Sequence, residues 1–350
     1  MQAQWEIMGR SKQFITLIAF AAAVILVLGT TVFLTTKDNS NPKHIAVPTS
    51  ETTPEATANS TARHAEPPAP MRGVTLDSIE HLDTAVQLLE SSPEQLTVRL
   101  VMDPGESLAT YDRAIDALDP HVYVMAQILD SEEMSKFSEQ DIRKRTQEAI
   151  DTIGDKVDVW EVGNELNGAW VGSSPAEINS KAVAAYEVIK QAGGNTAITL
   201  NYWSSHDCYS HDWEATLPYA QRMPESLRNA DYVFLSIYET ACNPPQRPSV
   251  ADIAKTLNSL GEIFPNARLG IGETGVQNTS DGMPSDGTLA QKEELANYYY
   301  GMQSELESEV GERYVGGYFW WYFHNDAVQP AAEQKTESLW PTIQRLTANL

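Results

Sequence analysis

VDVWEVGNE, residues 157–165, is the stretch of sequence that decides the fold. A short, mainly apolar and β-branched run ends at a glycine, and Asn164 and Glu165 follow directly. A run of this length and composition, bounded by a turn residue, indicates a buried β-strand. The strand therefore ends on two polar side chains, which is where a parallel sheet gathers its functional groups.

Seven further runs of the same kind alternate with amphipathic helical segments along the rest of the chain. The expected strands are residues 72–76, 97–102, 122–127, 157–162, 197–202, 232–237, 268–272 and 317–323. The expected helices are residues 107–118, 139–153, 175–192, 250–263, 289–307 and 336–346. Eight strand–helix units within residues 71–350 predict an α/β protein, a (β/α)₈ TIM barrel.

A doubly wound open sheet is the structural alternative to the barrel. Such a sheet usually carries a glycine-rich turn after its first strand. Here the first strand is followed by LDSIEHLDTAV, residues 76–86, which contains no glycine. The barrel is therefore preferred.

The first seventy residues have a composition unlike that of the barrel. An uncharged run of 21 residues extends from Phe14 to Leu34, and about 20 apolar residues suffice to cross a bilayer as a helix. Val32, Phe33 and Leu34 stand where a cleavable signal peptide would need small residues, so an uncleaved anchor is favoured over a cleaved signal peptide. We expect a cytoplasmic N-terminus (1–13), a transmembrane signal-anchor (14–35), and a flexible Pro/Thr-rich stalk (36–70).

Charge narrows the classes of ligand. The chain has a formal net charge of −24 at pH 7. Such a chain repels nucleic acid and anionic lipid headgroups, so its expected partner is a neutral or cationic substrate and its membrane contact is the anchor alone. With the anchor oriented in this way, the barrel would lie outside the cytoplasm, in a periplasmic or extracellular location.

Two glutamates end strands on opposite sides of the expected barrel mouth. Glu165 follows the fourth strand, and Glu273 ends the seventh in GIGETG, residues 270–275. Glycoside hydrolysis requires two facing carboxyl groups, one to protonate the leaving oxygen and one to attack the anomeric carbon or activate water. The competing interpretation is two solvated rim carboxylates, but both glutamates sit in apolar, glycine-flanked strand ends.

The Asn-Glu pair ending strand four and the glutamate ending strand seven resemble the retaining (β/α)₈ glycoside hydrolases of clan A. That clan includes cellulases, mannanases, xylanases, β-xylosidases and galactanases. The resemblance covers residues 71–350 by strand order rather than by dense identity. It implies that Glu165 is the acid/base, that Glu273 is the nucleophile, and that Asn164 binds the sugar 2-hydroxyl. It also implies double displacement without a cofactor.

Further positions match the clan's pattern. Arg99 on strand two corresponds to an arginine near the nucleophile, although it could instead be only an interior ion-pair partner of Glu161. Tyr238 corresponds to a tyrosine that hydrogen-bonds the nucleophile. Strand eight reads GYFWWYFHND, and because side chains alternate along a strand, only one of its two tryptophans can face the sugar site; we expect Trp321.

The chain also departs from the clan. The clan often has histidine two residues before the tyrosine, where this chain has Ser236, and some members have histidine on strand three, where this chain has Gln127. The exact family, the sugar and the linkage are therefore left open.

Two loops are expected to form the cleft walls: NYWSSHDCYSHDW, residues 201–213, and ETACNPPQRP, residues 239–248. Trp203 and His206 are expected to bind sugar, while Trp213 is equally suited to anchor the next helix. Cys208 and Cys242 fall one on each loop, and we expect a disulfide between them in an exported protein; two free thiols are the alternative. No third ligand accompanies the loop histidines, so no metal site is expected.

Three functions are consistent with these features. The first is a retaining β-glycosidase acting on an extracytoplasmic poly- or oligosaccharide. The second is a barrel that has lost catalysis and retains carbohydrate. The third is a membrane-anchored scaffold of an exopolysaccharide system. The presence of both glutamates favours the enzyme.

Overall fold

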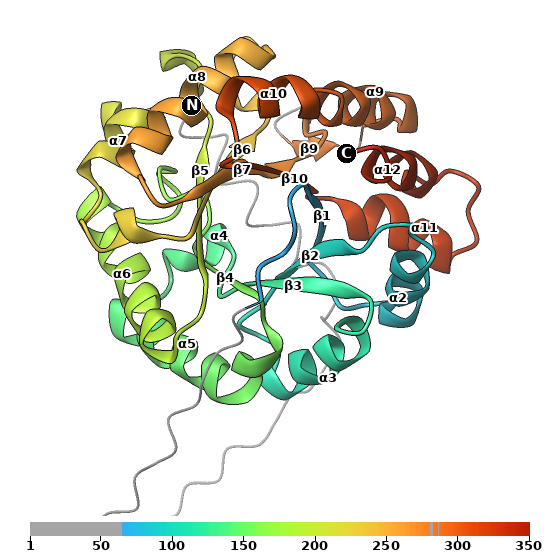
Figure 1. Cartoon of the computed structure of the whole chain (residues 1–350), viewed down its shortest axis with the longest axis horizontal. Helices are drawn as coiled ribbons and strands as arrows, with labels where there is room; N and C mark the ends of the chain where they lie inside the picture. Colours follow the sequence, from blue (N-terminus) through green and yellow to red (C-terminus); the bar gives the residue numbers. More distant parts are fainter. Residues whose placement is uncertain (1–64, 281–282, 286) are drawn as a thin grey trace, which may run out of the picture. The chain divides into compact units, whose positions relative to one another are not determined.

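The computed structural model describes residues 65–280, 283–285 and 287–350. Within them, eight parallel strands close into a barrel in the order β1-β10-β7-β6-β5-β4-β3-β2, surrounded by helices (Figure 1). The barrel strands are β1 (Met71–Leu76), β2 (Leu96–Val101), β3 (Val122–Gln127), β4 (Val159–Gly163), β5 (Thr196–Asn201), β6 (Tyr232–Ile237), β7 (Arg268–Thr274) and β10 (Tyr314–Trp320). The predicted (β/α)₈ barrel is confirmed.

The surrounding helices begin at well-formed caps. Ser107, Ser138, Ser174, Ser249 and Thr288 each accept a hydrogen bond from the first turn of the helix that follows. The helices are α2 (Leu82–Glu90), α3 (Leu108–Leu118), α4 (Ser131–Met134), α5 (Glu139–Ile153), α6 (Pro175–Ala192), α7 (Thr216–Arg222), α8 (Val250–Ile263), α9 (Leu289–Tyr300), α10 (Gln303–Val310), α11 (Gln329–Ala332) and α12 (Trp340–Thr347). A small antiparallel hairpin, β8 (Asn278–Ser280) and β9 (Met283–Ser285), follows β7.

The barrel interior has an apolar lower layer. A buried cluster of strand residues fills it: Met71, Met125, Val159, Ala197, Tyr232, Phe234, Val315 and Phe319. Because side chains two positions along a strand share a face, the next inward residues lie above this layer. Those residues are polar and buried, among them Arg99, Gln127, Glu161, Thr199 and Ser236. The interior thus changes from apolar to polar toward the carboxyl ends of the strands.

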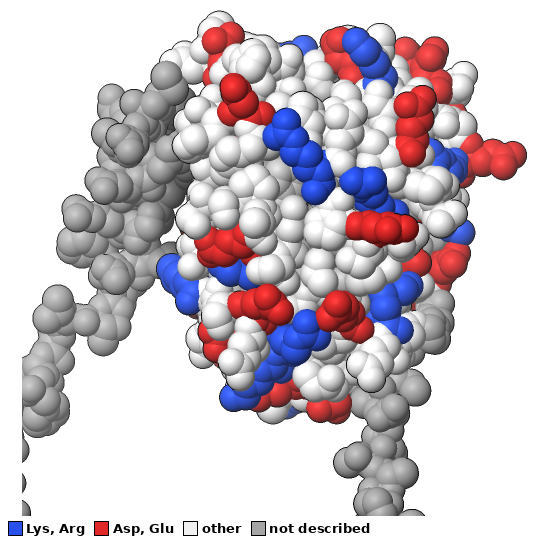
Figure 2. All heavy atoms as spheres, turned by 90° about the vertical axis from the view of Figure 1, so that its left-hand side faces the viewer, with Lys and Arg blue, Asp and Glu red and all other residues white. Residues whose placement is uncertain are grey.

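The face of the outer surface drawn in Figure 2 carries scattered charges of both signs. The face in Figure 2 shows Lys and Arg side chains interspersed with Asp and Glu, without a continuous basic area. Several of the charges on the helical shell are paired, as in Arg143–Glu187 at 2.8 Å and Lys190–Asp231 at 3.0 Å. Exposed pairs of this kind contribute only about 0–1 kcal/mol each to stability.

Residues 65–70, which the sequence analysis assigns to the end of the stalk, contact the barrel. The carbonyl of Ala65 accepts a hydrogen bond from Asn195, Glu66 pairs with Arg268 at 2.5 Å, and Pro67 is buried. Asn195 precedes β5 and Arg268 opens β7, so both contacts lie at the amino ends of the strands.

The expected anchor from Phe14 to Leu34 and the stalk up to residue 64 lie outside the described residues. Among the residues that are described, no helix combines the length and the apolar character needed to cross a bilayer.

Candidate active site

The position of Glu273 depends on an irregularity between β6 and β7. Leu235 lies opposite Ile271, but the next residue of β6, Ser236, lies opposite Glu273, so Gly272 is an extra residue in the pairing. A bulge of this kind re-aims the side chains that follow it. A Cβ on Gly272 would stand 2.5 Å from the Cβ of Phe234, so only glycine fits there. The bulge brings Glu273 to the inner face, level with Ser236.

Glu273 is held by one cation and one phenol. The Nη1 of Arg99 donates to its Oε2 at 2.7 Å, and the hydroxyl of Tyr238 donates to its Oε1 at 2.8 Å. Its side chain is 5% exposed. Burial raises the pKa of Glu273, whereas Arg99 and Tyr238 oppose that rise by stabilising the carboxylate. The pKa of Tyr238 is raised well above 10 by burial and by Glu273, so the phenol stays a neutral donor.

Arg99 connects two carboxyl groups and an aromatic ring. Its Nε donates to Glu161 at 2.7 Å, and its guanidinium lies 5.1 Å from the ring centre of Trp321. The second oxygen of Glu161 accepts from the hydroxyl of Thr199. Burial alone would lower the pKa of Arg99, but the two carboxylates outweigh it and raise that pKa, which keeps the guanidinium charged. Arg99 is thus both the partner of Glu161 and the neighbour of Glu273.

Glu165 accepts hydrogen bonds from two neutral hydroxyl groups. The hydroxyl of Ser236 donates to its Oε1 at 2.7 Å, and that of Ser131 donates to its Oε2 at 3.3 Å. Burial, followed by the negative charge of Glu273, raises the pKa of Glu165 well above its usual value, and the hydrogen bond from Ser236 offsets this only in part. The surroundings therefore favour the protonated form more strongly at Glu165 than at Glu273.

The backbone at Glu165 is in the left-handed region, with φ of 53°. Such a conformation is unfavourable for a non-glycine residue and persists where its surroundings over-determine it. Asn167, fully buried, supplies that constraint. Its Oδ1 accepts from the backbone of Asn201 at 2.7 Å, and its Nδ2 donates to the carbonyls of Asn201 and Glu214. The tight turn after β4 thereby presents Glu165 to the mouth.

Asn164 directly precedes Glu165, and Trp321 contacts Arg99. Asn164 is 1% exposed, and its buried Oδ1 has no hydrogen-bond partner among the described residues. Trp321 is partly exposed and stacks on Arg99, whereas Trp320 is buried and its indole donates to Asp326 at 2.8 Å. The two tryptophans therefore point in opposite directions, with Trp321 on the side of the site. The strand itself ends at Trp320 and not at residue 323.

Several site residues were not singled out from the sequence. Tyr322 is partly exposed, and its pKa is raised by burial and then by Glu273. Ser131, at the first turn of α4, contacts Glu165, and the indole of Trp170 donates to the same serine at 3.2 Å. Trp170 lies five residues beyond Glu165, on the loop that leaves β4. This closeness in sequence to Glu165 is the one feature that could have indicated Trp170 as a site residue. Ser131 follows the carboxyl end of β3 by four residues.

The two cleft loops are joined by the expected disulfide. Cys208, after β5, and Cys242, after β6, form a disulfide bond. Trp203 lies on the first loop and meets Trp170 edge to face, with ring centres 6.4 Å apart. His206 is on the same loop, but its side chain is 82% exposed and contacts Tyr209 and Asp212 rather than the two glutamates.

Trp213 and His211 serve the packing of the loop. The Trp213 ring contacts those of His211 and Tyr219, the latter on α7. His211 pairs through its ring with Glu214 at 3.0 Å, and Glu214 is buried. Trp213 was expected either to bind sugar or to anchor the next helix. Its contacts match the anchoring of α7.

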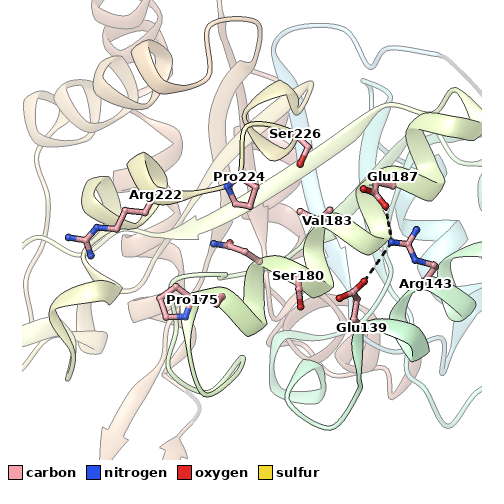
Figure 3. A pocket seen from close by; sticks show the side chains of 11 residues that line it. Glu139, Arg143, Pro175, Ser180, Val183, Glu187, Arg222, Pro224 and Ser226 are labelled. Atoms are coloured by element: carbon pink, nitrogen blue, oxygen red, sulfur yellow. Dashed lines mark hydrogen bonds and ion pairs between the residues drawn. The ribbon is translucent and has the colours of Figure 1, made fainter.

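A hollow of about 600 Å³ lies on the outer shell between α5, α6 and the segment after α7 (Figure 3). It is lined by Pro175, Arg222 and Pro224, among others, and has no aromatic lining residue. Arg143 at its rim is paired with Glu139 and Glu187, as the dashed lines in Figure 3 show. The hollow shares no residue with the glutamate site.

Comparison with known proteins gives fold relatives only. No protein-family model matches the chain, and no curated protein matches it. Among solved structures it is similar to a family 1 β-glucosidase from Thermotoga maritima, with a TM-score of 0.50 and 13% identity over 77% of this chain and 85% of that one. It is also similar to a GH5-4 broad-specificity endoglucanase from an uncultured bacterium, with a TM-score of 0.50 and 12% identity over 83% of this chain and 94% of that one. The barrel expected from the clan-A resemblance is thus shared with solved glycoside hydrolases.

Proposed function

We propose that this chain is a retaining glycoside hydrolase that cleaves β-glycosidic bonds in a poly- or oligosaccharide by double displacement. One observation carries the proposal: two neighbouring carboxyl groups, one buried and one partly buried, have different hydrogen-bond partners. Glu273 is held by a cation and a phenol, and Glu165 by two neutral hydroxyls. Such a pair separates into a nucleophile and an acid, as the reaction demands.

In the first step, a carboxylate oxygen of Glu273 attacks the anomeric carbon while Glu165 gives its proton to the glycosidic oxygen. The bond to the leaving sugar breaks, and a covalent glycosyl ester of Glu273 forms. Arg99 and Tyr238 orient the attacking carboxylate through their 2.7 and 2.8 Å hydrogen bonds. The carboxylate of Glu165 is left ionised at the end of this step.

In the second step, Glu165 removes a proton from water, and the resulting hydroxide attacks the anomeric carbon and displaces Glu273. Esterification removes the negative charge of Glu273, which is the second cause of the raised pKa of Glu165. The pKa of Glu165 therefore falls after the first step, which suits its change from acid to base. Hydrolysis restores both carboxyl groups to their original states.

Other groups are proposed to bind the sugar that becomes attached to Glu273. The buried, unpartnered Oδ1 of Asn164 supports a hydrogen bond to the sugar 2-hydroxyl, because buried polar atoms normally have partners. The ring of Trp321 supports stacking on an apolar sugar face.

We also propose that the enzyme works outside the cytoplasm and is tethered to the membrane by residues 14–34. The uncharged run of 21 residues supports the tether. The disulfide between Cys208 and Cys242 supports an oxidising compartment. Membrane fractionation of the full chain, followed by protease treatment of cells from which any outer membrane has been removed, tests both parts; protection of the barrel from the added protease would contradict them.

The function is tested by chemical rescue with a panel of aryl β-glycosides. Glu273→Ala is expected to lower kcat by roughly 10⁴-fold or more. Added azide should then restore turnover of the 2,4-dinitrophenyl glycoside, and NMR should show an α-glycosyl azide. Glu165→Ala with azide should instead yield the β-glycosyl azide, because the nucleophile remains.

Glu177→Gln is the matched control, because Glu177 lies on α6, where it pairs with Lys181. The kcat of this variant should equal that of the parent. Unchanged turnover in Glu273→Ala would refute the assignment. Carbohydrate binding without turnover in the parent chain would favour the inactive barrel.

A further inference from the structure

Trp170 and Trp203 form an aromatic corner at the rim of the barrel, on the β4 and β5 side. Both side chains are partly exposed, and their rings meet at 77° with centres 6.4 Å apart. The loops that carry them leave adjacent strands. The corner thus offers two nearly perpendicular faces on one side of the mouth.

Trp203 is not among the partly buried side chains that pack against the hydrophobic core of the described residues. Its indole Nε1 is buried and finds no acceptor among the described residues. An unsatisfied buried donor costs roughly 1–3 kcal/mol, a penalty that phenylalanine would avoid. By contrast, the neighbouring Trp213 packs against His211 and Tyr219 and has an evident structural role. The ring face of Trp203 therefore requires another explanation.

The corner is connected to Glu165 through one serine. The indole of Trp170 donates to Ser131 at 3.2 Å, and the hydroxyl of Ser131 donates to the Oε2 of Glu165 at 3.3 Å. Ser131 is buried, at 4% exposure. Because the tryptophan N–H occupies one lone pair of the serine, the serine proton is directed at the carboxyl group.

The barrel order separates this corner from the rest of the site. β10, after which Trp321 lies, is four strands from β4 in either direction around the ring, so the two stand opposite each other. Glu273 is on β7, next to β10. In double displacement the acid stands beside the leaving oxygen and the nucleophile beside the anomeric carbon. The Trp321 side therefore suits the sugar that is transferred, and the Trp170 side suits the part that leaves.

We propose that Trp170 and Trp203 form the leaving-group subsite and that its ligand is a pyranose ring of an oligosaccharide or polysaccharide. The inference rests on the proposed glycosidase function and adds a requirement for a sugar on the leaving side of the scissile bond. A pyranose can stack an apolar face on one indole while its edge meets the nearly perpendicular one, whereas a small alcohol would leave one of them uncovered. Ser131 is a positioning residue that ties Glu165 to the same subsite.

The test compares two leaving groups on one glycone. The parent enzyme is assayed on β-linked gluco-, manno-, galacto- and xylotetraose and on the corresponding 2,4-dinitrophenyl glycosides, whose leaving group needs neither a sugar subsite nor protonation. Trp203→Ala is expected to lower kcat/KM for the tetraose about tenfold or more, the size of a lost stacking contact, and to change the dinitrophenyl reaction less than about twofold.

Two conservative variants separate stacking from positioning. Trp203→Phe keeps a ring face and should retain most of the tetraose activity. Trp170→Phe keeps the face but removes the N–H to Ser131, so it should lower kcat for the tetraose, move the alkaline limb of its pH profile, and spare the dinitrophenyl glycoside. Trp213→Phe serves as the loop control and should leave the ratio of the two activities unchanged.

Equal losses on both substrates in Trp203→Ala, with an unchanged melting temperature, would overturn the subsite. Tetraose binding is measured in parallel in Glu273→Ala by isothermal titration. If the parent hydrolyses no substrate but tetraose binding still weakens in Trp203→Ala, the glycosidase function fails and the sugar subsite stands. If binding is absent as well, both fail.

Discussion

Arg99 donates to Glu161 and to Glu273 at the same distance, 2.7 Å, within a fully buried layer of the barrel. One cation thus compensates two carboxylates, and the second oxygen of each takes a neutral hydroxyl, from Thr199 and Tyr238 respectively. Glu161 therefore fixes one edge of the guanidinium, which in turn fixes Glu273. Glu273, the proposed nucleophile, is thus oriented by residues in the interior of the barrel.

Replacing Arg99 with Met should weaken both folding and catalysis. Two buried carboxylates lose their counter-charge, so unfolding free energy should fall by about 3–5 kcal/mol in denaturant titrations. Arg99 lowers the pKa of Glu273, so its removal raises that pKa. Because the nucleophile must be ionised, the acidic limb of kcat/KM should move to higher pH. Arg99→Lys, which keeps the charge, should show a smaller limb shift; an unshifted limb in Arg99→Met would contradict this account.

Ser236→Ala should move the alkaline limb of the pH profile of kcat/KM, whereas Arg99→Met moves the acidic limb. The hydroxyl of Ser236 stabilises the ionised form of Glu165 and so lowers its pKa. Without that hydrogen bond the pKa of Glu165 rises, the acid stays protonated to higher pH, and the alkaline limb of kcat/KM extends upward. Ser236→Thr retains the hydroxyl and is the matched control. A pH profile of each variant on an oligosaccharide decides the matter, and a downward shift in Ser236→Ala would count against the geometry.

Glu165→Gln should stabilise the fold near neutral pH while abolishing acid catalysis. The pKa of Glu165 is raised in the folded chain, so the carboxyl favours folding while protonated, and stability falls as pH rises from the unfolded pKa of about 4.3 to the folded pKa. Glutamine does not titrate. The stability difference should therefore be small at pH 4 and grow with pH, by about 1.4 kcal/mol per unit of pKa shift. Urea unfolding at several pH values measures it; a constant difference would argue against a raised pKa.

Asn167→Ala should lower stability and kcat together. The change removes four hydrogen bonds, among them those to the buried backbone N–H of Asn201 and the carbonyl of Glu214, so unfolding free energy should fall by about 2–4 kcal/mol. The left-handed turn at Glu165 loses its constraint, which should lower kcat more than it changes KM. Asn179→Ala, a buried amide bonded to Tyr219 away from the site, is the control and should leave kcat unchanged.

Removing the disulfide should affect the cleft wall as well as stability. Cys208 and Cys242 are 34 residues apart, and opening a loop of that length in the unfolded chain costs the fold about 4 kcal/mol in the chain-entropy description. Cys208→Ser together with Cys242→Ser should lower the melting temperature and raise KM for oligosaccharides. Values of KM equal to those of the parent would show that the wall keeps its shape without the bond.

The strands could be predicted from sequence because each is an apolar run of ordinary length. Residues 122–127 and 232–237 coincide with β3 and β6, and helices 139–153, 175–192 and 250–263 coincide with α5, α6 and α8. The expected helix 289–307 divides into α9 and α10 around Gly301 and Met302. The sequence pattern does not predict the first helix, α2, because the apolar pattern of this helix is short.

The direction of side chains was harder to predict than the strands. Strict alternation would direct Glu273 away from the interior, and the bulge at Gly272 reverses this. A bulge adds one residue without changing composition, so it leaves no periodic signal. Ser131 and Trp170 were missed for a related reason: they reach Glu165 from two different loops, and loop conformation does not follow from hydrophobic pattern. The assignments of catalytic roles to Glu165 and Glu273 stay predictions until the rescue experiment is done.

The contacts of Ala65 and Glu66 lie at the end of the barrel opposite the two glutamates. The chain joins the barrel where the strands start, at Asn195 and Arg268, whereas the paired glutamates stand where the strands finish. Under the proposed tether, the chain ahead of Ala65 would therefore leave the barrel on the side opposite the glutamates. A polymer bound at the glutamates would then not meet the point of attachment, so the length of the tether would set the reach of the site and not access to it.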